Sequence, residues 1–254
     1  MNTSKAIEIR LCETVEMFEG CVNLQHRVFD IPEIEISPIR HFIVTMHAGG
    51  FILGAFLENK MIGFCLSVPA YLDGERAFYS HMTAVDRKYQ CHGIGSRLKW
   101  KQREFALQRG VTQIKWTFQP EKALNAYFNL EKLGAEVREY MPNFYGTDYA
   151  TLPDESDIEI QSDRLFAVWD LNSEKTKRLF AGESFENSVE PAAFVEITSD
   201  WNELLRTDKA GAAREQKRIR GDFQRHFSKG LVCTGFRKDK DHSGYELFDR
   251  NTDA

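Results

Sequence analysis

The feature that most constrains the fold of this chain is a pair of glycines one residue apart, in QCHGIGSRLK (residues 90–99). The stretch follows an apolar segment, AFYSHMTAV (77–85), that predicts a strand, and it precedes a predicted helix to about Arg109. The first turn of a helix offers unpaired backbone N–H groups and a partial positive charge, so it binds anions. A side chain at Gly93 or Gly95 would block the approach of a phosphate or the backbone angles that the loop needs. The sequence therefore predicts a strand, an anion-binding loop and a helix in succession.

The charge around this loop supports an anionic ligand. Residues 86–110 contain seven Lys or Arg and two acidic residues. A P-loop nucleotide site is excluded because GxxxxGK[ST] is missing, and the Rossmann fingerprint needs three glycines directly after a strand. A tight turn before a helix is the alternative interpretation of the two glycines, and these residues alone leave it open.

The flanking segments predict an α/β fold, with a mixed, mostly antiparallel sheet and helices on both faces. The short turns ENK (58–60) and LDGE (72–75) predict two antiparallel hairpins, and Ser37-Pro38 predicts an N-cap followed by the first helical residue. Strands are expected at 6–11, 51–57, 61–70, 77–85, 112–118 and 163–171, and helices after Thr14, after Ser37 and at 121–133, the last closed by Gly134.

The chain is expected to form a core at 1–150 and a C-terminal extension at 151–254, with the final core strand at about 163–171. Residues 172–192 are polar and weakly patterned, which predicts a linker or a long loop. A small α+β subdomain is predicted from three further short strands and a basic helix, at 194–197, 231–236, 244–248 and 210–228.

Composition narrows the classes of function. The net charge of −5 argues against general nucleic-acid binding. The basic segment 214–226 has two interpretations, a surface that contacts nucleic acid or an acidic partner and a solvated helix face. No apolar run approaches the roughly 18 residues of a membrane span, and no signal-peptide core stands at the N-terminus. The five cysteines are odd in number and form no CxxC pair. We therefore expect reduced thiols, no metal, no membrane and a cytoplasmic protein.

Two motifs carry a family resemblance. Gln90-Cys91-His92-Gly93-Ile94-Gly95 matches Q/R-x-x-G-x-G and resembles the acyl-CoA pyrophosphate loop of the GNAT N-acetyltransferase superfamily. Downstream, NAYFNLEKLGAE (125–136) is similar to the second signature of that family, A-x-x-(L/F)-Y-x-x-x-G-(F/A). The two motifs occur in the expected order and spacing, and the resemblance covers about residues 7–145.

A closer resemblance extends over most of the chain. The segments YSHM (79–82), LKWKQRE (98–104), IKWTFQP (114–120), YGTD (145–148) and SDRLFAVWDL (162–171) are similar to a subgroup of larger predicted GNAT acyltransferases. Some members of that subgroup transfer succinyl groups to amino acids. The resemblance implies a GNAT fold whose sheet splays at the acyl-CoA site, with acetyl-CoA or succinyl-CoA as co-substrate.

The resemblance also implies which residues hold coenzyme A. Met82 to Val85 would contact the pantetheine and the thioester through their backbone, as an added strand does. The amides from Cys91 to Ser96 would bind the pyrophosphate, assisted by Arg97 or Lys88. The expected cofactor-binding residues are Met82, Thr83, Ala84, Val85, Gln90, Cys91, His92, Gly93, Ile94, Gly95, Ser96, Arg97, Asn125 and Asn129.

The chemistry needs a base, because the attacking amine must be neutral. Strand alternation predicts Tyr79, His81, Thr83 and Val85 on one face, and makes His81 the first candidate base; a hydrogen-bonded core histidine is the alternative. The family often has a tyrosine general acid four residues before the glycine of its second signature, where this chain has Leu130. The catalytic candidates are therefore His81, Asn125 and Tyr145, with Tyr127 and Asn129 as further polar groups on the same segment.

These observations predict an enzyme that transfers an acyl group from coenzyme A to the amine of a small metabolite. The sequence leaves two alternatives open, a non-catalytic acyl-CoA sensor and a protein N-acetyltransferase, and it also allows a homodimer. A succinyl donor would need a cation near its free carboxylate, and Arg40 or Arg76 are candidates.

Overall fold

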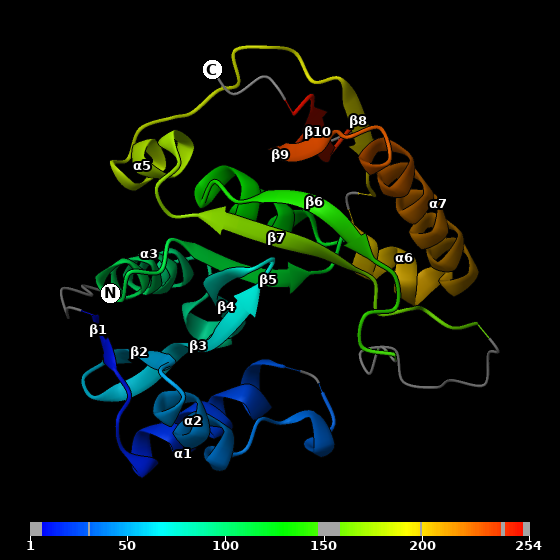
Figure 1. The fold of residues 1–254 in the computed structure, drawn as a ribbon. Helices are drawn as coiled ribbons and strands as arrows, with labels where there is room; N and C mark the ends of the chain where they lie inside the picture. Colours follow the sequence, from blue (N-terminus) through cyan, green and yellow to red (C-terminus); the bar gives the residue numbers. More distant parts are fainter. Residues whose placement is uncertain (1–6, 30, 147–157, 199, 240–241, 251–254) are drawn as a thin grey trace. The chain divides into compact units, whose positions relative to one another are not determined.

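The structure is a computed structural model that describes residues 7–29, 31–146, 158–198, 200–239 and 242–250 (Figure 1). As predicted, the fold is mixed α/β with an open, mostly antiparallel sheet. The chain divides into two compact units, Met1–Lys115 and Trp116–Ala254. The predicted domain boundary at residues 150–151 lies outside the described residues.

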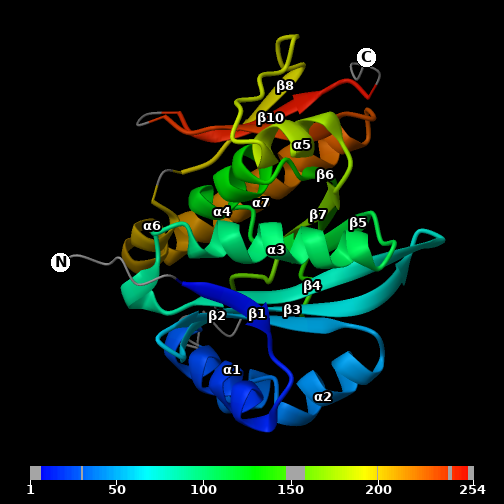
Figure 2. The ribbon, with the colours of Figure 1, turned by 90° about the vertical axis from the view of Figure 1, so that its left-hand side faces the viewer.

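The first unit contains the strand, loop and helix predicted around the two glycines. Its strand order is β1-β2-β3-β4-β5, antiparallel except for β4 and β5, and β5 continues into the second unit. In Figure 2, α1 and α2 cover one face of this sheet and α3 covers the other. The strands are β1 (Glu8–Leu11), β2 (Phe51–Leu57), β3 (Lys60–Leu72), β4 (Glu75–Val85) and β5 (Gln113–Phe118); the helices are α1 (Val15–Val28), α2 (Ile39–His47) and α3 (Ile94–Gln108), with 3-10 turns η1 (Glu33–Glu35) and η2 (Arg87–Tyr89).

Local sequence explains both hairpins of this unit. Glu58 and Asn59 have φ angles of 50° and 65°, and Asp73 and Gly74 have φ angles of 55° and 80°. Two successive left-handed residues are what a two-residue hairpin with a type I′ turn requires, and Asn, Asp and Gly tolerate that conformation best. The two hairpins predicted from these turns are therefore confirmed.

The helix start signals have different outcomes. Thr14 caps α1 as predicted, since its hydroxyl accepts a hydrogen bond from the backbone N–H of Met17 at 3.4 Å. The prediction that Ser37 is the N-cap of the second helix is wrong, because Pro38 occupies that position and α2 begins at Ile39. The Ser37 hydroxyl instead contacts His41, one turn into the helix.

The second unit holds more regular structure than the sequence predicted. Its strand order is β7-β6-β9-β10-β8. The strand β6 and the helix α6 were not predicted. The helix α5 lies inside the segment 172–192, which we expected to be a linker or a long loop. The elements are α4 (Ala123–Tyr127), the π-helix η3 (Phe128–Lys132), β6 (Glu136–Met141), β7 (Arg164–Asp170), α5 (Glu174–Phe180), β8 (Ala193–Glu196), α6 (Trp201–Thr207), α7 (Lys209–Phe227), β9 (Val232–Arg237) and β10 (Gly244–Phe248).

Tertiary contacts explain why α5 forms in a polar segment. The Ser173 hydroxyl caps the helix by accepting from the N–H of Thr176 at 3.2 Å. The indole N–H of the fully buried Trp169 donates to the Thr176 hydroxyl at 3.2 Å. A cap and one buried polar contact therefore hold a seven-residue helix that has little apolar periodicity of its own.

The predicted basic helix is confirmed as α7, and its arginines are paired within the protein. Arg218 contacts Glu215 at 2.7 Å and Asp222 at 2.8 Å, and Arg225 also pairs with Asp222. Compensated charges of this kind favour a solvated, structural helix over a nucleic-acid surface. Among the described residues, no helix is long and apolar enough to cross a membrane.

One arginine of α7 reaches a buried carboxylate. Asp163, which is 0% exposed at its side chain, accepts two hydrogen bonds from Arg220, at 2.7 and 2.9 Å. It also accepts from the Tyr140 hydroxyl at 2.6 Å and from the backbone N–H of Asn143 at 2.9 Å. All the acceptor capacity of this carboxylate is thus used by donors from β6, from the turn that follows β6 and from α7.

We expect Arg220→Met to lower the free energy of unfolding by about 3–5 kcal/mol, because it leaves the Asp163 charge buried without its cation. Urea denaturation followed by circular dichroism measures the change. Arg206→Met is the matched control, since the Arg206–Glu203 pair is 71% and 53% exposed and should contribute less than about 1 kcal/mol. Equal effects of the two substitutions would contradict the prediction.

A second buried carboxylate responds to pH. Glu121 is 3% exposed, and its Oε1 accepts from Gln216 Nε2 at 3.0 Å. Burial raises the pKa of Glu121 to about 7, because the charged form is poorly solvated, and the Gln216 hydrogen bond only partly opposes this. The folded state therefore keeps a proton that the unfolded chain has already lost, between the ordinary value of 4.5 and about 7.

We expect stability from Glu121 to be fully present below pH 4.5 and to decrease as the pH rises toward 7. Glu121→Gln should remove this dependence and should stabilise the protein at pH 8 by up to about 3 kcal/mol. Unfolding free energies at pH 5, 6, 7 and 8 test it, with the exposed Glu174→Gln as control. Parallel pH curves for wild type and Glu121→Gln would refute the assignment.

Candidate active site

The loop between β4 and α3 is held by its own side chains. The Asp86 carboxylate accepts from the N–H of Lys88 at 3.2 Å, and Gln90 Nε2 donates to the Val85 carbonyl at 2.9 Å. Cys91 has a φ of 62°, and Gly93, the N-cap residue of α3, has a φ of 75°. Two of three successive residues in the loop therefore have a left-handed backbone conformation, and the chain continues directly into the first turn of the helix.

The start of α3 provides donors and space for an anion. Gly93 has no side chain to cap the helix, so the amides of its first turn are left for another acceptor. A Cβ built on Gly95 would meet no atom within 4 Å, so this glycine faces open space. Amides that point out of a helix beside a surface without a side chain are what close contact with a phosphate needs. The geometry of the loop therefore suits an anion such as a phosphate group.

Cations around the loop have different contacts. Arg97 donates to the Ile7 carbonyl at 2.6 Å and so ties the loop region to the start of β1. Lys88 is exposed on η2. His92 is also exposed, with its Nδ1 2.6 Å from the Gln90 carbonyl oxygen. Both cations that the sequence proposed for the phosphate, Lys88 and Arg97, are therefore exposed, and the Arg97 guanidinium already has a carbonyl partner.

A β-bulge interrupts β4 at His81. Leu66 of β3 pairs with Met82 and the next residue, Ser67, pairs with Ser80, so His81 has no partner in this ladder. The prediction that Tyr79, His81, Thr83 and Val85 share one face is therefore wrong, because an extra residue reverses the alternation.

The contacts on each side of the bulge confirm the reversal. The Ser80 hydroxyl contacts Lys99 and Gln102 of α3, at 3.0 and 3.1 Å. Met82 and Ala84 pack into the core beneath α1 and α2, and His81 contacts His41 of α2. His81 and Met82 are thus successive residues on the same face, and a bulge is a common means of directing a side chain toward a site.

His81 lies beside a second histidine that the sequence analysis did not single out. The rings of His81 and His41 are 5.3 Å apart between centroids and inclined at 68°, edge to face. Surrounding protein lowers the pKa of His81, and the charge of His41 lowers it further. Part of the His81 side chain is exposed, so water moderates the shift, but its direction leaves the imidazole neutral at pH 7. A neutral imidazole is the form that accepts a proton.

The residues Met82 to Val85 are available to a ligand at one edge of β4. Within the first unit, β4 pairs with β5 only through Phe78–Ile114 and Tyr79–Lys115, while β3 pairs along the other edge up to Val85. An extended ligand such as pantetheine can use the backbone groups of such an edge.

The other candidate residues belong to the second unit. The predicted helix 121–133 is an α-helix up to Tyr127 and a π-helix after it, where Leu133 N–H donates to the Phe128 carbonyl at 3.1 Å. The wider turn changes the environment of residues four apart, so Asn125 is exposed and Asn129 is 5% exposed. A shared polar stripe is therefore not present. Leu130, at the position of the expected tyrosine, is fully buried.

Tyr145 lies near the end of β5 in the second unit. Its hydroxyl is 3.3 Å from that of Thr117, and the Arg164 guanidinium lies 5.0 Å from its ring centroid. Tyr145 is 52% exposed. Tyr145 is thus an exposed residue that carries a phenol, whereas Leu130 is buried and apolar.

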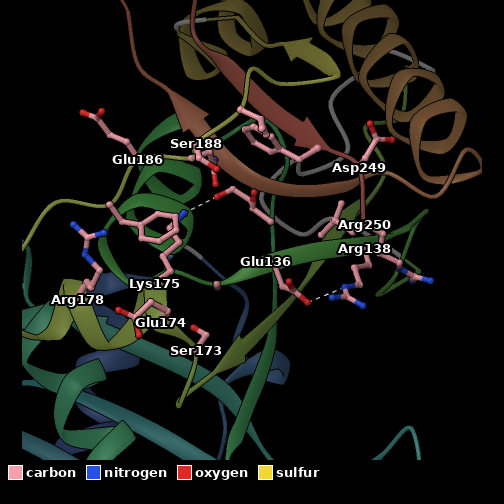
Figure 3. Close-up of a pocket in the computed structure, with 18 residues that line it drawn as sticks. Glu136, Arg138, Ser173, Glu174, Lys175, Arg178, Glu186, Ser188, Asp249 and Arg250 are labelled. Atoms are coloured by element: carbon pink, nitrogen blue, oxygen red, sulfur yellow. Dashed lines mark hydrogen bonds and ion pairs between the residues drawn. The ribbon is translucent and has the colours of Figure 1, made fainter. Parts of the chain in front are cut away.

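The second unit also contains a pocket of about 570 Å³ between α5, β6 and β9, which none of the predicted site residues lines (Figure 3). Lys175 enters it beside Phe185 and donates to the Thr234 carbonyl at 2.6 Å, while Arg138 pairs with Glu136 at 2.8 Å. Four cationic and four acidic side chains line it, so neither sign of charge predominates.

The sequence analysis did not single out His41 or Gln25, and it considered Ser37 only as a helix cap. Ser37 and His41 are four residues apart on one helical entry, a spacing that places side chains together. That spacing could have indicated the contact between Ser37 and His41. The contact of His41 with His81, forty positions later, could not be predicted from the sequence.

Comparison with known proteins agrees with the fold. The sequence profile described as the acetyltransferase (GNAT) family matches residues 18–135. No curated protein matches the chain. The family match supports an N-acyltransferase enzyme.

Solved structures show the same fold at low sequence identity. The ribosomal-protein alanine N-acetyltransferase from Escherichia coli is 17% identical, with a TM-score of 0.51 over 66% of this chain and 96% of that one. An N-acetyltransferase from Staphylococcus aureus Mu50 is 13% identical, with a TM-score of 0.53 over 66% and 99%. A putative acetyltransferase from Desulfovibrio desulfuricans is 12% identical, with a TM-score of 0.53 over 65% and 99%. The stretch that matches the acetyltransferase (GNAT) profile, residues 18–135, includes the glycine loop and the bulged strand.

Proposed function

We propose that this protein transfers an acetyl or succinyl group from coenzyme A to the amine of a small metabolite, such as an amino acid. The observation that carries the proposal is the loop at Gly93 and Gly95, where free amides and open space meet at the start of α3. Coenzyme A would bind with its pyrophosphate on the amides from Cys91 to Ser96 and its pantetheine along Met82 to Val85.

The reaction forms a bond between the amine nitrogen and the thioester carbonyl carbon, and it breaks the bond from that carbon to sulfur. His81 takes the proton that the amine loses, directly or through water. A backbone N–H near Thr83 stabilises the negative charge on the carbonyl oxygen. The thiolate of coenzyme A leaves and takes up a proton, for which Tyr145 and Asn125 are the candidate donors in place of Leu130.

The acyl group depends on whether a cation reaches the end of the donor. A succinyl carboxylate would pair with an arginine, and both candidates, Arg40 on α2 and Arg76 on β4, are exposed. Arg40→Gln or Arg76→Gln should therefore raise the KM for succinyl-CoA and leave that for acetyl-CoA unchanged, if succinyl is the natural group.

A second candidate function is a non-catalytic acyl-CoA sensor. The observation that favours it is Leu130, which is apolar and 0% exposed where the resemblance expects a general acid. Such a protein would bind acyl-CoA without turning it over. A protein N-acetyltransferase is a further alternative, distinguished by its acceptor.

Thiol release from acetyl-CoA and from succinyl-CoA, measured with a panel of amino acids, polyamines and a peptide with a free N-terminus, separates these functions. We expect amine-dependent release, with an N-acylated small product identified by mass spectrometry. Binding of both thioesters without release would support the sensor, and acylation of the peptide alone would support a protein acetyltransferase.

A further inference from the structure

A series of buried contacts leads from the core of the first unit toward His81. Gln25 of α1 is 0% exposed and holds the backbone of Ser37 by two hydrogen bonds. Its Nε2 donates to the Ser37 carbonyl at 3.1 Å, and its Oε1 accepts from the Ser37 N–H at 2.9 Å. Because the amide side chain satisfies both backbone groups, the chain that enters α2 is fixed at this residue.

Ser37 in turn fixes His41. The Ser37 hydroxyl lies 3.2 Å from Nδ1 of His41, and Ser37 itself is only 8% exposed. A hydrogen bond to one ring nitrogen of a histidine sets which nitrogen carries the proton and restrains the plane of the ring. The orientation of the His41 ring therefore depends on the Ser37 hydroxyl.

His41 presents this restrained ring to the bulged residue of β4. The edge-to-face contact at 5.3 Å limits the rotation of the His81 ring, which has no cross-strand partner at the bulge. Aromatic contacts of this geometry are favourable and directional. The bulge directs the His81 side chain to the face of α2, and His41 meets it there.

The surroundings of the pair carry little other charge. His41 is the one group among the described residues whose charge lowers the pKa of His81. Gln25 of α1, which bonds to Ser37, is uncharged, and so are Leu66 and Ser67, the β3 residues paired on either side of the bulge. Two imidazolium rings at this distance would repel each other, so the pair favours the neutral form of both rings.

We propose that His41 is a positioning residue for acyl transfer: anchored through Ser37 and Gln25, its ring holds the imidazole of His81 in the orientation needed to accept the proton of the amine. This inference rests on the proposed function, in which His81 is the base. His41 itself makes no contact with the reacting atoms in this assignment.

The test compares His41→Phe, Ser37→Ala and the control His47→Phe in the full chain. His47 lies at the exposed end of the same helix. NMR titration of the His81 ring in the ligand-free protein reports its pKa and its environment. Steady-state kinetics with acetyl-CoA or succinyl-CoA and the amine panel give kcat and KM separately.

We expect His41→Phe to raise the titration midpoint of His81, because a repelling neighbour is lost, and to lower kcat about 10- to 100-fold with KM for the thioester nearly unchanged. Ser37→Ala should alter the His81 ring signals and lower kcat less, and His47→Phe should change neither. Unaltered His81 signals in both variants would overturn the inference, and so would altered signals with an unaltered kcat. An unaltered kcat in His81→Gln would instead reject the base assigned under the proposed function.

Discussion

Gly95→Val should weaken the binding of coenzyme A at least about 100-fold while leaving the protein folded. The new side chain projects into the open space at the first turn of α3, because a Cβ there meets no atom within 4 Å. It would keep the pyrophosphate from the helix amides, and losing two hydrogen bonds to a charged group costs about 3–6 kcal/mol. Isothermal titration calorimetry measures the affinity, and thermal unfolding shows whether the fold is intact.

Gly221→Val is the matched control for this prediction. Gly221 also lies in a helix, α7, and a Cβ there also meets no atom within 4 Å. Both substitutions therefore place a β-branched side chain on a helix, in space that no atom occupies. Only Gly95 belongs to the glycine loop. If coenzyme A bound both variants as tightly as wild type, the loop would not be the pyrophosphate site.

His81→Gln should lower kcat for acyl transfer by about 100- to 10,000-fold, the usual contribution of a general base. Glutamine keeps a polar side chain of similar length but accepts no proton near neutral pH. The KM for the thioester should change little, because the assigned contacts to coenzyme A lie at the loop and along the β4 backbone. Steady-state kinetics with the amine identified by thiol release provide the measurement.

The pH profile gives a second, independent test of His81. The base works only when neutral, so kcat falls as the pH decreases through its pKa. Because protein surroundings and His41 lower that pKa, the acidic limb of wild type should lie below the ordinary value of 6.5. This limb should disappear in His81→Gln and remain in His26→Gln, which alters an exposed histidine of α1. Identical profiles for all three proteins would exclude His81 as the base.

Local features of this fold could be predicted because each depends on residues close in sequence. The Asn59 and Asp73-Gly74 turns set both hairpins, since only left-handed backbone closes a two-residue loop. The glycine loop and α3 were predicted for the same reason, because Gly93 combines a positive φ with the absence of a capping side chain. The residue identities at these positions leave few other conformations.

Features that depend on distant contacts could not be predicted. The helix α5 forms because Thr176 meets the buried Trp169, and its own sequence is polar. The bulge at His81 follows from the register between β3 and β4, which alternation along β4 alone cannot reveal. The π-helix after Tyr127 likewise separates Asn125 from Asn129, although their spacing fits an ordinary helix.

The sequence by itself determined the order of strand, glycine loop and helix, because backbone conformation at glycine, asparagine and aspartate is decided by steric contacts within a few residues. Only the tertiary structure decided which face of the sheet His81 occupies. It also decided that His81 contacts His41, which is linked through Ser37 to Gln25. These contacts join α1, α2 and β4, and the free energy that selects them comes from packing and from satisfying buried polar groups across the whole first unit, which no short stretch of sequence contains.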